Sequence, residues 1–317
     1  MKNKLIISLT IISTIIFSGC KDNVDLPDQP LSDYIQVYMP QAVNGPVTYN
    51  FSTSDTASPT ITYGADYGGD GYPSKDVSVT FGIDTAAVDR FNLANNTNYT
   101  LFPAKSYKLS DSVAIIKKGE VSTNPFKVTL FTTGGNAPGD ISKTYVLPIS
   151  IKSASAKVNE NLRTSYYIIN IIPTFFDRSN WKIIDFSTQE ATGEGSNNGR
   201  AIFVLDGDIN TYWHSEWQNA QSSPPHYITV DLGESKRLLG SNLIARQNVN
   251  SGRPQDIQIF VSENDLDWEL AYTGALQNTG DPQKVFFDAA MQGRYVKLQI
   301  NSSFSSNLTH LAEFYLF

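Results

Sequence analysis

Cysteine is almost absent from this chain of 317 residues, and the single Cys20 makes an internal disulfide impossible. Lysine and arginine number 24 against 31 acidic residues, and no basic tract occurs, which disfavours nucleic-acid binding. No long apolar run follows residue 17, so we expect no membrane-spanning helix. Methionine is scarce, whereas tyrosine and phenylalanine are frequent, a composition that favours strands. The length predicts two domains.

Histidine is also scarce, and its three copies argue against several classes of enzyme. His214, His226 and His310 form no HExxH pattern, and no GxSxG nucleophile elbow is present. Acidic pairs exist, but the sequence cannot place them across a glycosidic bond. We therefore predict a binding protein and not an enzyme. His226 starts a predicted strand beside a proline, and we expect its side chain to be exposed.

The first twenty residues have the pattern of a targeting segment. A basic start at residues 1–4 precedes an apolar stretch at 5–17 that is too short to span a bilayer. The sequence FSGC at 17–20 resembles the lipobox of bacterial lipoproteins. This resemblance implies cleavage before Cys20 and a lipid anchor on that residue. A buried structural cysteine is the alternative.

The polar residues after Cys20 indicate where the protein is displayed. The sequence KDNVD at 21–25 resembles the surface-export signal of Bacteroidetes lipoproteins. It implies a protein anchored in the outer membrane by lipid alone and facing the cell exterior. Residues 21–32 contain two prolines and are typical of an extended tether.

Residues 33–172 have the pattern of an immunoglobulin-like β-sandwich. Apolar and polar residues alternate at 77–83 and at 145–151, as in half-buried strands, and turns rich in glycine and proline separate the strands. Asp84 is the predicted N-cap of a short helix at 86–93. Strands are expected at 34–39, 47–51, 60–63, 77–83, 113–117, 126–131, 145–151 and 166–172.

Two runs in this first half carry a family resemblance. The run that begins with YTLFP at 99–103 and continues to Gly119, followed by YVLPI at 145–149, resembles the N-terminal domain-of-unknown-function family 1735 of Bacteroidetes surface lipoproteins. The resemblance implies no established function. The region also contains no histidine and no recognisable catalytic set of residues.

Residues 178–317 form a second predicted unit after a boundary at 173–177. Strands are expected at 181–186, 227–232, 238–246, 256–262, 269–274, 283–288, 294–300 and 312–317. Ordered motifs follow one another in this half: VLDGD at 204–208 with TYW at 211–213, HYITVDLG at 226–233, IFVSEN at 259–264 with Trp268, GRYVKL at 293–298 and LAEF at 311–314. Together they resemble the discoidin, or coagulation factor V/VIII type C, domain, which includes the family 32 carbohydrate-binding modules. The resemblance implies an eight-stranded jelly-roll β-sandwich that binds a ligand. The fold class is therefore all-β.

The sequence DGDINT at 206–211 has the composition of a cation-binding turn, because a hard cation takes about six to eight oxygen ligands. Asp-Gly-Asp is also common in turns without metal. The discoidin resemblance implies a structural Ca²⁺ between this turn and the last strand. Its implied ligands are the carbonyls of Phe203, Asp208, Thr211 and Ala312, the Thr211 hydroxyl, and the carboxylates of Asp206 and Glu313. A solvent-facing Glu313 on an edge strand is the alternative.

The sequence WHSEW at 213–217 places indoles, an imidazole and a carboxylate together, which suits a small polar ligand with one apolar face. We assign Trp213 to the core. By resemblance to the sugar-binding discoidin domains, the binding residues are His214, Trp217, Arg246, Asn250 and Phe304. A galactose-like ring would stack its C–H face on Trp217 while polar side chains converge on its axial hydroxyl. Glu216 and Arg253 flank this site without an assigned role.

Alternatives stay open for the site and for the function. Trp217 could be partly buried in the core, and Arg246 could form a surface salt bridge. The leading prediction is a cell-surface lipoprotein that binds glycans, with terminal galactose or N-acetylgalactosamine as the preferred ligand. The alternative is a non-enzymatic adhesin or scaffold that binds protein or lipid head groups. The polar character of residues 213–217 favours sugar, because lipid-binding members display apolar side chains on these loops.

Overall fold

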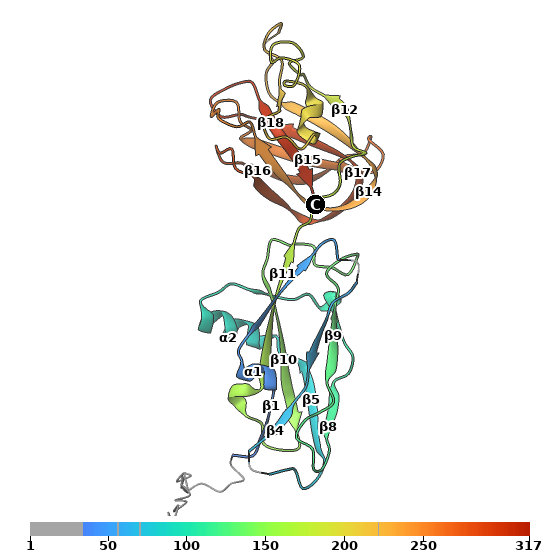
Figure 1. Ribbon diagram of the computed structural model, residues 1–317, viewed down its shortest axis with the longest axis vertical. Coiled ribbons are helices and arrows are strands. Elements are labelled where there is room, and N and C mark those ends of the chain that lie inside the picture. Colours follow the sequence, from blue (N-terminus) through green and yellow to red (C-terminus); the bar gives the residue numbers. More distant parts are fainter. Residues whose placement is uncertain (1–33, 56, 70, 221) are drawn as a thin grey trace, which may run out of the picture.

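The computed structural model describes residues 34–55, 57–69, 71–220 and 222–317. Two β-sandwiches follow each other along the chain and stack end to end, with the C-terminus at their junction (Figure 1). The predicted all-β class, an immunoglobulin-like sandwich followed by a discoidin-type sandwich, is confirmed. Within the described ranges, no helix is both long and apolar enough to cross a bilayer. The predicted targeting segment and tether, with Cys20, lie outside the described residues.

The first sandwich packs a six-stranded sheet against a three-stranded one. The larger sheet has the order β2-β11-β10-β5-β8, with β6 paired to β10, and the smaller has the order β3-β9-β7. Alternating apolar residues of both sheets fill the core between them, as the period of two requires. The strands are β1 (Gln36–Tyr38), β2 (Val47–Ser52), β3 (Thr60–Tyr63), β4 (Asp66–Gly68), β5 (Val77–Ile83), β6 (Thr100–Leu101), β7 (Tyr107–Leu109), β8 (Val113–Ile116), β9 (Phe126–Leu130), β10 (Tyr145–Ala154) and β11 (Thr164–Ile172).

Short helices fill the connections of both sandwiches. They are α1 (Pro40–Val43), α2 (Ala86–Asn95), η2 (Ala104–Ser106), η3 (Glu160–Leu162) and η4 (Ala201–Leu205). The prediction that Asp84 caps α2 is wrong, because the N-cap is Thr85 and its side chain makes no capping hydrogen bond. The Asp84 carboxylate instead lies 2.7 Å from Arg90 Nη2. Helix α2 ends at Asn95, and the C-cap residue Asn96 adopts a left-handed conformation (φ 52°) that asparagine tolerates.

The second sandwich is built from a seven-stranded sheet in the order β13-β18-β14-β17-β15-β16, with β12 paired to β14. Its long strands β14 (His226–Ala245) and β17 (Gln283–Ile300) each join two segments that the sequence predicts as separate strands. The pairing register of β14 shifts after Asp231 and after Leu238, so its first part pairs with β12 and its last part with β18. The other strands are β12 (Lys182–Phe186), β13 (Trp213–His214), β15 (Asp256–Ser262), β16 (Glu269–Ala275) and β18 (His310–Leu316).

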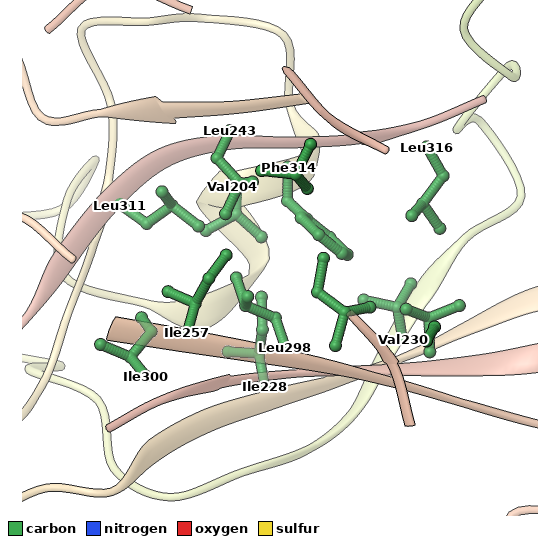
Figure 2. Close-up of a cluster of buried hydrophobic side chains, with 14 of the residues drawn as sticks. Val204, Ile228, Val230, Leu243, Ile257, Leu298, Ile300, Leu311, Phe314 and Leu316 are labelled. Atoms are coloured by element: carbon green, nitrogen blue, oxygen red, sulfur yellow. The ribbon is translucent and has the colours of Figure 1, made fainter. Parts of the chain in front are cut away.

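The core of the second sandwich is closely packed and apolar. Figure 2 shows side chains of β14, β17 and β18 pointing toward one another, among them Ile228, Leu298 and Phe314, and all three are completely buried. Each such side chain contributes about 1.5–3 kcal/mol by leaving water. Trp213, which we assigned to the core, is also completely buried, and its Nε1 donates to Thr188 O at 2.8 Å. This frame fixes the strand ends from which the loops of the candidate site emerge.

A small apolar cluster joins the two sandwiches. Ile141 and Ile171 of the first half meet Leu239 and Phe317 of the second, and none of the four is more than 5% exposed. Arg237 Nη2 adds a hydrogen bond across the junction to Pro138 O at 3.1 Å. The two halves are therefore packed against each other and are not separated by a free linker.

Candidate ligand-binding site

Trp217 is the most open aromatic side chain of the predicted sugar site, at 41% exposure. Its indole Nε1 donates to Glu194 Oε1 at 3.0 Å, which holds one edge of the ring. A Cβ atom on Gly193 would lie only 2.7 Å from the indole Cζ2, so glycine lets this loop pass close to the ring. The indole is a fixed surface platform and is not part of the core.

Glu190, whose role was not predicted, pins the two loops that carry this platform. Its Oε1 accepts from Gly193 N at 2.8 Å, and its Oε2 accepts from Trp217 N at 3.1 Å and Gln218 N at 2.9 Å. Burial would raise the pKa of this carboxyl, which is only 1% exposed, but the backbone hydrogen bonds lower its pKa to about 2. The carboxylate is therefore charged at neutral pH and holds residues 190–193 against residues 217–218.

Glu194 lies at the centre of the site, although its role was not predicted from the sequence. Its carboxylate accepts from Tyr212 Oη at 2.5 Å and from the Trp217 indole. Arg246 Nη2 lies 3.8 Å from Glu194 Oε2, and His214 Nε2 lies 4.0 Å from Oε1. Burial raises the pKa of Glu194, but these hydrogen bonds and positive neighbours outweigh it and lower the pKa overall. Three predicted residues thus converge on one charged acceptor.

His214 offers a hydrogen-bond acceptor to this site. Its ring Nδ1 lies 2.7 Å from Ser215 O, and because a carbonyl only accepts, Nδ1 must carry the proton. The ring is 8% exposed, and burial is the main cause that lowers the His214 pKa, so the neutral form is favoured. His310 packs beside it, with ring centroids 5.4 Å apart. In the neutral ring, Nε2 keeps a free lone pair on the side of Glu194.

Arg246 supplies the hydrogen-bond donors of the candidate site. Its guanidinium carbon lies 3.9 Å above the Tyr212 ring, which fixes the plane of the group. Arg246 Nη2 lies 3.8 Å from Glu194 Oε2, which is longer than a hydrogen bond. The surface salt bridge is therefore an ion pair without a direct hydrogen bond. Arg253 is 6% exposed, and its Nε donates to Arg246 O at 3.3 Å. Arg253 therefore supports the backbone of Arg246.

Asn250 and Phe304 lie on loops that adjoin these residues. Asn250 is exposed, and Phe304 is partly buried. Phe304 N donates to Arg253 O at 2.9 Å, and Gly252 N donates to Phe304 O at 2.7 Å, so their two loops lie side by side. The structure brings His214, Trp217 and Arg246 together around Glu194. Phe304 is connected to this group only through Arg253, and within the part of the chain that the structure describes Asn250 makes no contact with it that would assign a role.

His226 lies apart from this group. The expectation that its side chain is exposed is wrong, because the residue has no exposed surface and its Nε2 lies 2.7 Å from Asn307 O. The reason is its position in the sheet, where it starts the long strand β14 and pairs with Ile300 of β17. His226 anchors the 301–307 loop to the sheet.

The predicted calcium turn is closed by its own hydrogen bonds. Asp206 Oδ1 accepts from Asp208 N at 2.9 Å, and Asp206 Oδ2 accepts from Thr211 Oγ1 at 2.7 Å. Gly207 adopts φ 86°, which favours glycine. Among the described residues no three His, Cys, Asp or Glu side chains cluster as metal ligands, so backbone carbonyls would have to complete a cation site here.

Glu313 is the second carboxylate of this region. It is completely buried, so the alternative of a solvent-facing Glu313 is wrong. Its Oε2 accepts from Arg178 Nη1 at 2.6 Å, whereas the buried Oε1 has no hydrogen-bond partner. Burial, together with Asp206 nearby, raises the Glu313 pKa to about 7. An unpartnered carboxylate oxygen beside a second carboxylate fits a bound cation.

Comparison with known proteins identifies both halves of the chain. The F5/8 type C domain model matches residues 183–314, and a family of N-terminal domains matches residues 31–158, as the resemblances implied. A sialidase of Micromonospora viridifaciens is 31% identical over 173 residues, which cover 52% of this chain and 26% of the sialidase. The chain therefore spans about a quarter of the length of that curated relative.

Solved structures are similar to the C-terminal half. The C-terminal domain of a chitobiase from Bacteroides fragilis is 29% identical, with a TM-score of 0.43, and the match covers 45% of this chain and 97% of that one. The CBM32-5 module of a Clostridium perfringens protein, solved with GalNAc-β-1,3-galactose, is 23% identical, with a TM-score of 0.42 and coverage of 45% and 99%. Residues 183–314 of this chain are an F5/8 type C, or discoidin, domain.

Proposed function

We propose that this protein binds glycans through the group around Glu194, and that terminal galactose or N-acetylgalactosamine is its ligand. The observation that carries the proposal is the exposed ring of Trp217 beside convergent hydrogen-bond donors and acceptors. A sugar ring has C–H groups on one face and hydroxyls at its edge, and this arrangement is complementary to both. The family resemblance of residues 183–314 to carbohydrate-binding modules supports the same ligand class.

The polar groups favour a hydroxyl that both donates and accepts. His214 Nε2 and the Glu194 carboxylate only accept, and Arg246 only donates. They stand 3.8–4.0 Å apart, a gap that calls for a bridging group such as a hydroxyl. An axial hydroxyl projects to one side of the ring, where it can reach these groups while the C–H face stacks on Trp217. We expect weak binding, with Kd between about millimolar and tens of micromolar, or about −4 to −6 kcal/mol.

Titration of the chain with galactose, N-acetylgalactosamine, glucose and mannose tests the proposal. Trp217→Ala should abolish measurable binding, because the indole is the one group that removes apolar sugar surface from water. Trp268→Ala is the matched control, since Trp268 lies outside the site and packs on Lys297. Binding that survives both Trp217→Ala and Arg246→Ala would place the site elsewhere. A preference for glucose or mannose would reject the axial-hydroxyl argument.

The proposal includes no catalysis. Glu190 and Glu194 are the carboxylates that contact the binding residues, and each is already engaged by several donors. A general acid needs a raised pKa, whereas the pKa values of both groups are lowered. Release of product from a chromogenic galactoside above the level of the Glu194→Gln variant would contradict this part of the proposal.

We also propose that a lipid on Cys20 anchors the protein in the outer membrane, facing outward. This part rests on the sequence FSGC at 17–20 and on the acidic residues that follow. Strand β1, which follows the tether, lies in Figure 1 at the end of the first sandwich away from the second. Expressed in its host, the wild type should partition into detergent, and Cys20→Ser should not. Full protection from protease on intact cells would reject outward display.

Calcium is the proposed structural cofactor. Asp206 and Glu313 would bind it with their carboxylates, the Thr211 hydroxyl would join them, and the carbonyls of Phe203, Asp208, Thr211 and Ala312 would complete the oxygen set. The register between β14 and β18 shifts at Ala312, which has no paired residue on β14, because Ile244 pairs with Glu313 and Ala245 pairs with Leu311. The ion would supply the positive charge that the unpartnered Glu313 Oε1 lacks. Its part is to stabilise the turn that leads into β13, and it takes no contact with the sugar.

A further inference from the structure

A polar hollow lies on the first sandwich, far in sequence from the proposed sugar site. It has a volume of about 470 Å³ and lies between helix α2, strands β10 and β11, and the η3 turn. Three cationic side chains line it, Arg90, Lys152 and Arg163, together with the carboxylates of Asp84 and Glu160. Pockets of about 300–1,000 Å³ are the usual size for small ligands.

Lys152 reaches this hollow because of two features of the backbone. In the pairing of β10 with β5, Ile151 is opposite Phe81 and Ser153 is opposite Thr80, so Lys152 is an extra, bulged residue. A bulge redirects a side chain and is common beside functional sites. Gly82 on β5 leaves room for the Lys152 stem, since a Cβ there would lie 3.2 Å from Lys152 Cγ.

The charges of the hollow do not balance. The Asp84 carboxylate forms ion pairs with two cations, with Oδ2 at 2.7 Å from Arg90 Nη2 and Oδ1 at 3.7 Å from Lys152 Nζ. The longer distance is beyond hydrogen bonding, so the Lys152 ammonium faces Asp84 without a direct bond. Arg163 is paired with Glu160, whose side chain is 67% exposed and well solvated. Three positive charges therefore share two carboxylates among the residues that line the hollow, which leaves an excess of one positive charge.

The rest of the lining is suited to a polyhydroxylated ring. Tyr166 packs on Phe91 with ring centroids 4.8 Å apart, which holds the tyrosine ring in place. The hydroxyls of Ser150 and Thr164 lie 2.7 Å apart at the wall. Ile151 is the single aliphatic residue of the lining. An aromatic ring beside a hydroxyl and charged groups also occurs in the Glu194 group, in Trp217, Tyr212 and Arg246.

We propose that this hollow is a second saccharide site, and that it takes an acidic sugar whose carboxylate binds Lys152 and Arg163. The excess positive charge selects for an anion, and Tyr166 with the hydroxyls selects for a sugar ring. The site is independent of the Glu194 group, and the two sites together would let one molecule hold a glycan that carries both neutral and acidic units.

Titration of the Trp217→Ala chain tests this proposal apart from the first site. The probes are D-galacturonic acid, D-glucuronic acid and galactose 6-sulfate, with D-galactose as the neutral control and acetate as the anion control. Uronic acids should bind, and added salt should weaken their binding. Lys152→Met, which keeps the stem and removes the charge, should weaken it about three- to fivefold, as should Arg163→Ala. Lys117→Ala, at an exposed lysine outside the hollow, should change nothing.

Four results would overturn the proposal. Acetate binding as tight as that of the uronic acids would show a site for simple anions. Galactose binding as tight as that of the uronic acids, unaffected by Lys152→Met, would remove the basis for charge selection. Absence of any uronic acid binding would reject the site altogether. A preference for galactose 6-sulfate over both uronic acids would reject the carboxylate as the bound group.

Discussion

Two glutamates of one loop act in different ways on the candidate sugar site. Glu190 is buried and engages backbone N–H groups, whereas Glu194 gathers the side chains of Tyr212 and Trp217 and stands near Arg246. Glu190 therefore determines where the loops lie, and Glu194 determines what they present to a ligand. Substitutions at these two residues should accordingly separate stability from binding.

Glu190→Gln should destabilise the fold in a pH-dependent way. An amide cannot accept all the hydrogen bonds of the carboxylate, and we expect a loss of about 1–3 kcal/mol at neutral pH. The pKa of Glu190 falls from 4.5 to about 2 on folding, so its stabilisation is complete above pH 4.5 and is lost as the pH falls toward 2. Denaturant unfolding of both proteins across this range measures the difference. Glu269→Gln, at an exposed residue of β16, is the control and should show little change.

Only some residues of the candidate site could be predicted from the sequence. His214, Trp217 and Arg246 could be named because motifs with fixed spacing surround them. Glu194 could not, because it lies in the glycine- and asparagine-rich stretch ATGEGSNNG at 191–199, which carries no periodic signal. Its role exists only once the loop folds over Tyr212 and Trp217. Asp84 was misjudged as a helix cap because composition cannot show that Arg90 and Lys152 compete for its carboxylate.

At the scale of elements, most strands could be predicted from alternation, but their continuity could not. The segments 227–232 and 238–246 are separated by the polar stretch GESKR at 233–237, which has the composition of a turn. In the structure β14 passes through it, because β17 pairs along both parts and the register shift absorbs the irregularity. Tertiary pairing thus overrides local composition.

The pairing order predicts where the second sandwich is most resistant to substitution. Leu298 of β17 lies in the middle of the sheet and is completely buried, so Leu298→Ala should cost about 2–5 kcal/mol. Leu270 lies on the edge strand β16 and is 50% exposed, so Leu270→Ala should cost less than about 1 kcal/mol. Chemical denaturation of the two variants measures both values. Equal losses would contradict the sheet order.

The Asp-Gly turn predicts a stabilising effect of calcium. A ligand that binds only the folded state adds stability once its free concentration exceeds Kd. The melting temperature should therefore rise with calcium and fall with chelator, and Asp206→Ala should abolish the difference. Asp265→Ala, at an exposed residue in the turn after β15, should retain it. No difference in the wild type, with no metal by elemental analysis, would reject the proposed cofactor.

At the scale of the whole molecule, the junction decides whether the two sandwiches move as one. Segment 173–177 is tied to both, since Thr174 N donates to Thr53 Oγ1 at 2.8 Å and Phe176 N donates to Leu316 O at 3.0 Å. Interfaces within a chain commonly allow relative motion unless they are large and apolar. Here an apolar cluster, a hydrogen-bonded connection and the Arg237 bond across the junction all oppose such motion.

We therefore predict that the two sandwiches unfold in one cooperative transition. Phe317 is 1% exposed and packs at the junction against Phe175 and Phe286, with ring centroids 6.0 and 5.5 Å away. Phe317→Ala removes this shared ring, so calorimetry should resolve two transitions, and small-angle scattering should show a larger radius of gyration. Phe186→Ala, at an exposed ring of β12, should leave one transition. Two separate transitions in the wild type would show that neither sandwich stabilises the other through the junction. A single transition would indicate that the two sandwiches form one unit, which would keep the candidate sugar site at a fixed orientation to the first sandwich. The loops after β12 extend from the end of the second sandwich opposite the first (Figure 1).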